Sequence, residues 1–235
     1  MPRRILKLSL SEYIQLFTSQ SKYLLLLIGI VIVHLIEVNV LDLFFTEFVG
    51  IDFAHTFQMI EGNIVYWFSQ HGMPVFVNFF VLIYIIIYPF TLWFSPFYFI
   101  VTDDKKAMKT LVFGLLFLYS IALPFYLFFP VTNVYTFYGA NSALETVIPS
   151  VENFFYSTTT CNNCFPSLHV AMTLLIAHSV SVTKNKKYMY FSYFCAVSVI
   201  VSVIYLGIHW ITDVVGGILL ALGVFYLQKK LITED

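Results

Sequence analysis

Charged residues are scarce in this sequence, since Asp, Glu, Lys and Arg together make up 11% of it. Soluble globular domains carry about 25% charged residues, so this low content excludes an ordinary soluble domain. Hydrophobic residues make up 60% of the chain, and its mean hydropathy is +0.85. These values are typical of a protein that lies in a lipid bilayer, and no nucleic-acid partner is expected.

Arginine is almost absent, because Arg3 and Arg4 are the two arginines of the whole chain. The segments 46–73, 130–167 and 209–210 contain neither lysine nor arginine. A phosphate site built from these segments would therefore lack the planar guanidinium group that holds phosphate through two parallel hydrogen bonds.

Internal repeats, low-complexity linkers and a secretory cleavage pattern are also absent from the sequence. The first apolar stretch is too long for the hydrophobic region of a signal peptide, so it is interpreted as a retained membrane span. We expect a single domain that covers residues 1–235.

Six apolar runs are candidates to cross about 30 Å of hydrocarbon as helices. The second run carries Pro89 and Pro96, which predict a kink or a break near its end. Residues 53–70 place apolar side chains at helical spacing and predict an amphipathic helix at the membrane interface. The predicted fold is all-α, an integral membrane protein with this interfacial helix and six transmembrane helices at about 23–45, 74–101, 108–129, 168–183, 189–208 and 211–228.

The basic residues indicate an orientation, because Lys and Arg in short loops mark the cytoplasmic side of a membrane protein. With six spans, both termini are predicted to be cytoplasmic and the lysine-free segments extracytoplasmic. All basic residues of the chain then fall on one side: Arg3, Arg4, Lys7, Lys22, Lys105, Lys106, Lys109, Lys184, Lys186, Lys187, Lys229 and Lys230.

A polar stretch reading TCNNCFPSLHVAMT, from Thr160 to Thr173, leads into the fourth apolar run. Pro166 and Ser167 open this run, a serine can cap the first turn of a helix, and His169 lies within that turn. The N-terminus of a helix presents unpaired N–H groups and a partial positive charge. This stretch is therefore a candidate anion site.

A second polar set, YLGIHWITDVVGG, lies at the start of the sixth run. His209 and Asp213 are four residues apart and share one face of a helix, so the carboxylate can accept a hydrogen bond from one ring nitrogen. That bond fixes the tautomer and leaves the other nitrogen as a base or nucleophile. Gly216 and Gly217 permit close helix approach. Together with His169, this pair forms a candidate catalytic centre.

The Pro-Ser-Leu-His motif ending at His169, followed by the His-x3-Asp of His209 and Asp213, resembles the second and third signature motifs of the type 2 phosphatidic acid phosphatase superfamily. The motif region covers about residues 128–217. The resemblance implies that His209 becomes a phosphohistidine, that Asp213 orients it and that His169 protonates the leaving alcohol. Water then hydrolyses the intermediate, or another alcohol takes the phosphoryl group in relatives that are transferases.

The same resemblance implies the phosphate-binding groups. These are the backbone N–H groups around Ser167 and Leu168 together with the Ser167 hydroxyl group. In the third motif Ser202 matches the family, but Val203 stands where the family has an arginine.

This sequence departs furthest from the family in the first motif, which in the family contains a lysine and an Arg-Pro pair. The nearest candidate is FFPVTNVY at residues 128–135, which resembles the proline-containing version in the inositol phosphorylceramide synthase branch. Asn133 and Tyr135 stand where a basic residue is expected, and they are candidate phosphate-binding residues.

Three explanations of the missing cations stay open. The site can rely on its histidines, Ser167 and helix-end amides, which suit a phosphodiester or another weakly charged substrate. A second explanation is that the chemistry is lost, and the pocket binds a lipid headgroup or is a structural element. Alternatively, a divalent cation replaces the missing side chains. The resemblance itself requires no cofactor, and no metal ligands are assigned. The acidic residues available to hold such a cation in the outer loops are Glu47, Asp52, Glu61, Glu145 and Glu152.

We therefore expect an integral membrane lipid phosphatase, most simply in the cell membrane, with an extracytoplasmic site that hydrolyses a lipid phosphate or diphosphate. Its expected partners are the lipid substrate and the bilayer. Two alternatives stay open: a lipid headgroup phosphotransferase of the same fold, and a non-enzymatic headgroup-binding protein.

Other polar residues have simpler interpretations. Cys161 and Cys164 leave open a zinc site together with His169, or a local disulfide, although structural zinc sites need four ligands. His34 and Glu37, three residues apart in the first span, predict a buried polar pair or a cavity lining. His178 predicts a hydrogen bond between helices.

Overall fold

A computed structural model describes residues 8–151 and 156–232 of the chain. Within these ranges the chain is helical, and its β-structure is limited to one isolated bridge between Val131 and Asn163. Five helical runs there are long and apolar enough to cross a membrane, namely Ser21–Val49, Pro74–Val101, Lys105–Phe128, Lys186–Tyr205 and Ile211–Lys230. This confirms the predicted all-α integral membrane fold.

The first two apolar runs are each assembled from three consecutive helical segments. The first consists of α2 (Ser21–Ile36), the π-helix η2 (Glu37–Leu41) and α3 (Asp42–Val49). The second consists of α6 (Pro74–Leu82), the π-helix η3 (Ile83–Ile87) and α7 (Tyr88–Val101). Helix α7 contains Pro96 and continues to Val101, so the predicted break near the end is wrong. The irregular segment comes earlier, in η3.

Polar side chains fix where several helices begin. Helix α8 (Lys105–Phe128) is capped by Asp104, which accepts a hydrogen bond from the N–H of Ala107. Helix α13 (Lys186–Tyr205) is capped in the same way by Asn185. A glycine marks the end of another helix: Gly50 ends α3 with a φ of 63°, a left-handed conformation that glycine adopts without steric cost.

The centre of the bundle is α12 (Leu168–Ser181), which packs against α7, α8, α13 and α14 (Ile211–Ile232). Ten of its 14 residues are buried. At 1.5 Å per residue it is about 21 Å long, which is shorter than a hydrocarbon core. The fourth predicted span is therefore a short buried helix, and the count of six spans stays a prediction.

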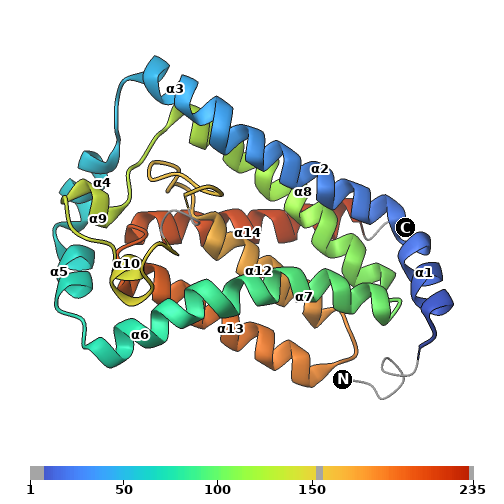
Figure 1. The fold of residues 1–235 in the computed structure, drawn as a ribbon. Coiled ribbons are helices and arrows are strands. Elements are labelled where there is room, and N and C mark those ends of the chain that lie inside the picture. Colours follow the sequence, from blue (N-terminus) through green and yellow to red (C-terminus); the bar gives the residue numbers. More distant parts are fainter. Residues whose placement is uncertain (1–7, 152–155, 233–235) are drawn as a thin grey trace.

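The region predicted as one amphipathic helix over residues 53–70 is two helices. They are α4 (Ala54–Glu61) and α5 (Ile64–Gln70), and the prediction of a single helix is wrong. Gly62 between them has a φ of 65°, which an uninterrupted helix does not allow. Figure 1 shows α4 and α5 at the same end of the bundle as α9 (Val134–Phe137) and α10 (Ala143–Val147).

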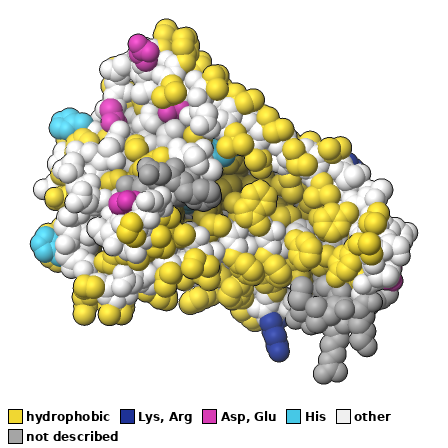
Figure 2. Space-filling model, viewed as in Figure 1, with side chains coloured by type: hydrophobic (Ala, Val, Ile, Leu, Met, Phe, Trp, Pro, Cys, Tyr) yellow, Lys and Arg dark blue, Asp and Glu magenta, His cyan; other side chains and the backbone are white. Residues whose placement is uncertain are grey.

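The two ends of the bundle differ in charge. Lysines lie at the starts of α2, α8 and α13 and at the end of α14, and in Figure 1 these helix ends lie near α1 (Leu10–Ser19), opposite the short helices. On the face shown in Figure 2, hydrophobic side chains cover the bundle, and most of the visible acidic side chains lie at the end with the short helices. The placement of these ends relative to a cytoplasm stays a prediction.

Candidate active site

The backbone brings the starts of α12 and α14 together. Ser167 caps α12 through a side-chain hydrogen bond from the N–H of Val170. Its own N–H donates to the carbonyl of Asp213 at 3.1 Å, which ties the loop before α12 to the first turn of α14. His169, in the first turn of α12, therefore lies beside the loop that carries His209.

Two glycines make this close approach possible. A Cβ atom at Gly217 would come within 2.5 Å of the carbonyl oxygen of Ser167, and one at Gly216 would come within 2.5 Å of the ring of Phe165. Real Cβ atoms do not make such contacts. The predicted role of these two glycines in close helix approach agrees with this geometry.

The candidate catalytic residues form a continuous line of contacts. His169 Nδ1 lies 3.1 Å from His209 Nε2, and His209 Nδ1 lies 3.2 Å from Asp213 Oδ2. Asp213 Oδ2 also accepts a hydrogen bond from the N–H of Trp210, at 2.9 Å. His209 and Asp213 are both buried, with 3% and 0% of their surface exposed. The two predicted histidines and the aspartate thus lie together.

Donor and acceptor rules assign the protons in this line. Asp213 accepts, so His209 carries its proton on Nδ1 and presents a lone pair at Nε2. His169 must then donate from Nδ1 to that lone pair, which leaves its own Nε2 as an acceptor. The Tyr84 hydroxyl lies 2.8 Å from His169 Nε2 and can donate to it. Every contact in the chain Tyr84, His169, His209, Asp213 is satisfied with both imidazoles neutral.

Burial explains the neutral state of His209, which lies in the loop between α13 and α14. It lowers the pKa of this imidazole from 6.5 to about 3, because a charged ring is poorly solvated there. Burial likewise raises the pKa of the neighbouring Cys164 thiol, so this cysteine stays protonated. The site therefore contains an uncharged imidazole with a lone pair on Nε2, as attack on an electrophile requires.

Tyr84 was not among the residues singled out from the sequence. It belongs to η3, and Tyr88 follows it four residues later; both rings lie beside the His169 ring, with centroids at 5.2 and 5.3 Å. Two tyrosines with helical spacing inside an apolar span were the signal that could have identified this wall of the site.

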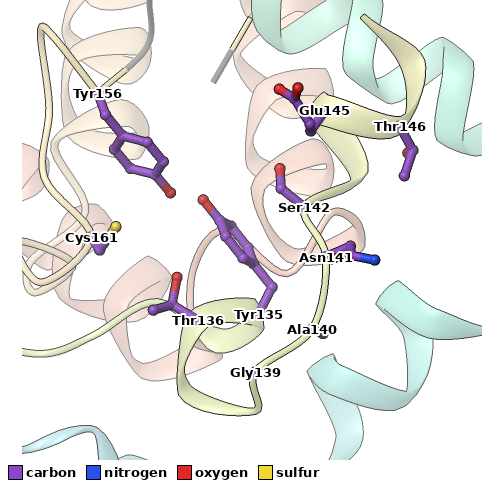
Figure 3. Close-up of a pocket in the computed structure, with 10 residues that line it drawn as sticks. All are labelled: Tyr135, Thr136, Gly139, Ala140, Asn141, Ser142, Glu145, Thr146, Tyr156 and Cys161. Atoms are coloured by element: carbon purple, nitrogen blue, oxygen red, sulfur yellow. The ribbon is translucent and has the colours of Figure 1, made fainter. Parts of the chain in front are cut away.

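The predicted phosphate-binding residues have different environments. Ser167 and Leu168 are buried at the start of α12. Asn133 is a buried helix cap: its side-chain oxygen accepts from the N–H of Thr136 at 2.9 Å, and its amide donates to the Tyr156 hydroxyl at 3.3 Å. Tyr135 lies in α9 and lines a cavity of about 560 Å³, which Figure 3 shows.

Helix α9 is fastened to the loop that carries His209. The N–H of Tyr135 donates to the Gly207 carbonyl at 3.3 Å, and the indole N–H of Trp210 donates to the Thr132 carbonyl at 2.8 Å. Asn133 and Tyr135 therefore belong to the same corner of the molecule as the histidines, although Asn133 is occupied as a cap.

Three of the outer acidic residues have structural partners. Glu61 accepts hydrogen bonds from the N–H groups of Ile211 and Thr212, at 2.9 and 2.6 Å, and so caps α14. Asp52 accepts from the N–H groups of Ala54 and Thr132. Glu145 accepts from the N–H of Ser150 and lines the cavity near Tyr135.

One group among the described residues has donor atoms arranged as metal ligands could be. Cys164, His209 and Asp213 present sulfur, nitrogen and oxygen atoms that all lie within 4.8 Å of one another. This is not the Cys161, Cys164 and His169 set that the sequence left open. Because a structural zinc site needs four ligands and His209 already binds Asp213, we assign no metal here.

The cysteines and two further histidines have separate environments. None of the three cysteines forms a disulfide, so the one left open for Cys161 and Cys164 is not present in this structure. His34 and Glu37 face each other at 3.5 Å and line a groove between α2 and α8, as predicted. His178 stacks on the ring of Phe225 with centroids at 4.2 Å. That ring contact takes the place of the predicted hydrogen bond.

Comparison with known proteins gave one finding. A family model described as the PAP2 superfamily matches residues 46–227, which is more than half of the chain and includes both histidine motifs. Searches of curated proteins and of solved structures gave no match. The chain therefore belongs to the PAP2 superfamily, the type 2 phosphatidic acid phosphatases and their relatives.

Proposed function

We propose that the protein hydrolyses the phosphoester bond of a membrane lipid through a covalent intermediate on His209. The observation that carries this proposal is the line of contacts from Tyr84 through His169 and His209 to Asp213. A neutral imidazole oriented by a buried carboxylate is the arrangement that a nitrogen nucleophile needs. Membership of a superfamily of phosphoester-cleaving membrane enzymes supports the same reaction class.

The proposed reaction has two displacements at phosphorus. In the first, His209 Nε2 forms a bond to phosphorus while the bond from phosphorus to the lipid oxygen breaks. His169, protonated when the anionic substrate binds, gives its proton to that oxygen, and the lipid alcohol leaves. In the second, water attacks phosphorus, its proton passes to His169, and the bond between phosphorus and His209 breaks.

Helix-end amides are proposed to bind the phosphate oxygens. The N–H groups of Ser167 and Leu168 lie at the start of α12, where the partial positive charge of a helix favours an anion. Ser167 donates its N–H to Asp213 in the unliganded arrangement, so Leu168 and the following amides are the better donors. A divalent cation is a second source of positive charge, and a chelator added to a turnover assay tests it.

Phosphate release from a panel of lipid phosphates and diphosphates, in detergent or liposomes, tests the proposal. We expect turnover by the native chain and a loss of at least about a thousandfold in His209→Ala, because the nucleophile is removed. His55→Ala, a change at an exposed histidine of α4, is the matched control and should keep native turnover. Equal turnover by His209→Ala and the native chain would contradict the proposal.

A groove between α2 and α8 favours a second candidate function, transfer of the phosphoryl group to a lipid alcohol. The groove has a volume of about 280 Å³ and is mostly apolar, and His34 and Glu37 lie on its wall. Tyr126 also lines it and donates a hydrogen bond to the Pro166 carbonyl at 2.8 Å, next to the cap of α12. The groove thus adjoins the candidate active site.

His34 and Glu37 belong to the polar part of this groove. His34 Nε2 donates to the Thr158 carbonyl at 2.9 Å, which leaves Nδ1 as the second ring nitrogen. This buried Nδ1 atom has no hydrogen-bond partner among the described residues and faces the Glu37 carboxylate at 3.5 Å. A lipid hydroxyl group could donate to the Glu37 carboxylate. Transfer from a labelled lipid phosphate to an added lipid alcohol, in competition with phosphate release, distinguishes the two functions.

The extracytoplasmic location of the site is also a proposal, supported by the lysines at the opposite end of the bundle. Cys161 is partly exposed, whereas Cys164 and Cys195 are buried. A membrane-impermeant thiol reagent applied to intact cells should therefore label Cys161, and Cys161→Ser should lose the label. Labelling only after the membrane is permeabilised would place the site on the cytoplasmic side.

A further inference from the structure

The largest cavity described above lies beside the candidate active site and has a distinctive lining. It has a volume of about 560 Å³ and lies between α9, α10 and the segment around Tyr156. Figure 3 shows the hydroxyl groups of Tyr135 and Tyr156 directed toward each other, with Glu145 and Ser142 on the neighbouring α10 segment. We call this cavity the outer pocket.

The walls of the outer pocket connect it to the line of contacts that runs from Tyr84 through His169 and His209 to Asp213. Tyr135 donates its N–H to the carbonyl of Gly207, two residues before His209. The N–H of Asn133 donates to the carbonyl of Cys161, a residue of the pocket wall, at 2.7 Å. A group bound at the histidines could therefore extend into the outer pocket.

The charge of the outer pocket is negative. Among its described lining residues, Glu145 alone carries a formal charge at pH 7. Residues 110–183 contain no lysine or arginine that could neutralise it. One oxygen of Glu145 accepts a hydrogen bond from the N–H of Ser150 at 2.8 Å, which holds the carboxylate in the wall of the cavity.

A negative carboxylate and tyrosine rings that line one cavity suit a cation. The negative faces of aromatic rings attract ammonium groups, and a nearby carboxylate adds Coulomb attraction. A phosphate monoester with two negative charges would be repelled by Glu145. A zwitterionic headgroup, in contrast, supplies its own cation beside its phosphate and needs no arginine from the protein.

We propose that the outer pocket binds the ammonium end of a zwitterionic phosphodiester lipid while its phosphate is bound at His209, in place of the contact between His209 and His169. This inference rests on the proposed function and names its substrate class. In the first displacement the bond from phosphorus to the lipid-side oxygen breaks, and His169 protonates that oxygen. The headgroup stays joined to phosphorus on His209 until water releases it as a soluble phosphomonoester.

The test compares phosphodiester lipids that differ in the headgroup charge. Full-length protein in liposomes is assayed for soluble headgroup phosphate released from phosphatidylcholine and from phosphatidylglycerol, and for inorganic phosphate released from phosphatidate, each with and without a chelator. We expect the highest kcat/KM on phosphatidylcholine, unchanged by the chelator. Highest activity on phosphatidate, or activity that needs a divalent ion bound at Glu145, would overturn the inference while the proposed function stood.

Glu145→Gln removes the charge of the carboxylate and keeps its shape and its acceptor for Ser150. We expect KM for phosphatidylcholine to rise about tenfold with little change in kcat, and KM for phosphatidylglycerol to stay the same or fall. Glu47→Gln, at an exposed acidic residue of α3, is the matched control and should behave as native. Equal effects of Glu145→Gln on both lipids would contradict the inference.

A binding measurement keeps the inference testable if no lipid is turned over. Calorimetric titration with dihexanoylphosphatidylcholine below its micelle concentration uses the native chain and Glu145→Gln. Weaker binding to Glu145→Gln, with dihexanoylphosphatidylglycerol unaffected, would support the pocket even if the proposed catalysis failed. Equal binding of both lipids to both proteins would overturn the pocket assignment whether or not catalysis occurs.

Discussion

Two histidine–carboxylate pairs in this molecule look alike in sequence and differ in structure. His209 and Asp213 are 3.2 Å apart, and the second nitrogen of His209 faces His169. His34 and Glu37 are 3.5 Å apart, and the second nitrogen of His34 donates to a backbone carbonyl, that of Thr158. A neighbouring carboxylate is therefore not enough to make a histidine reactive. What distinguishes His209 is a lone pair directed at another proton-carrying side chain.

The largest expected effect separates the two histidines themselves. His209→Ala should lower lipid phosphate turnover at least about a thousandfold, because it removes the nucleophile. His34→Ala should change phosphate release less than about threefold, because His34 lines the groove between α2 and α8 and makes no hydrogen bond to His169, His209 or Asp213. Steady-state kinetics on both variants checks this. Comparable losses in the two variants would erase the distinction between the pairs.

The carboxylates should differ in the same direction with a smaller effect. In Asp213→Asn the amide can present an N–H to His209 Nδ1, which favours the wrong tautomer, and we expect kcat to fall about a hundredfold. Glu37→Gln should leave kcat for phosphate release near the native value. Circular dichroism confirms that both variants are folded. A native kcat in Asp213→Asn would show that Asp213 does not set the tautomer.

The contact that brings the His209 pair to α12 is the next target. In Gly217→Ala the new Cβ would collide with the Ser167 carbonyl, so we expect a loss of about 2 kcal/mol in stability and a lower kcat. Gly223→Ala, on the same helix with open space around it, is the control and should be neutral or slightly stabilising. Thermal unfolding in detergent measures both. If Gly217→Ala melts at the same temperature as Gly223→Ala, the close contact at Gly217 does not stabilise the packing of α14 against the start of α12.

The smallest expected effect concerns the tyrosines around His169. Tyr84→Phe removes the hydroxyl that donates to His169 Nε2, and we expect kcat to fall about tenfold. Tyr88→Phe keeps a ring beside His169, for which the structure gives a ring contact and no hydrogen bond to the imidazole. It should have less effect on kcat than Tyr84→Phe. The reverse order would assign the proton relay to Tyr88.

Most of the helices and the histidine motifs could be predicted from the sequence because both depend on short-range patterns. Apolar runs of about 20 residues and the four-residue spacing of His209 and Asp213 are visible without a structure. The closeness of the two motifs followed from the expectation that two helix starts meet at one face, and the glycines at 216 and 217 pointed the same way.

What escaped prediction depends on tertiary contacts. Tyr84 is one aromatic residue among many in an apolar span, and only the packing of η3 against α12 makes it a partner of His169. Glu61 seemed available to recruit a cation, yet it caps α14 from a helix 150 residues away in sequence. Gly62 divides the predicted interfacial helix through its positive φ, and no periodicity in the sequence marks that conformation.

The most direct test of the account is to locate the phosphoryl group on the trapped enzyme. The native chain and the His209→Ala and His34→Ala variants are mixed with a lipid labelled at phosphorus, quenched in alkali, which preserves phosphohistidine, and analysed by peptide mass spectrometry. The account predicts a label on His209 in the native chain and in His34→Ala, and none in His209→Ala. A label on His34, on His169, or on the His209→Ala variant would contradict it.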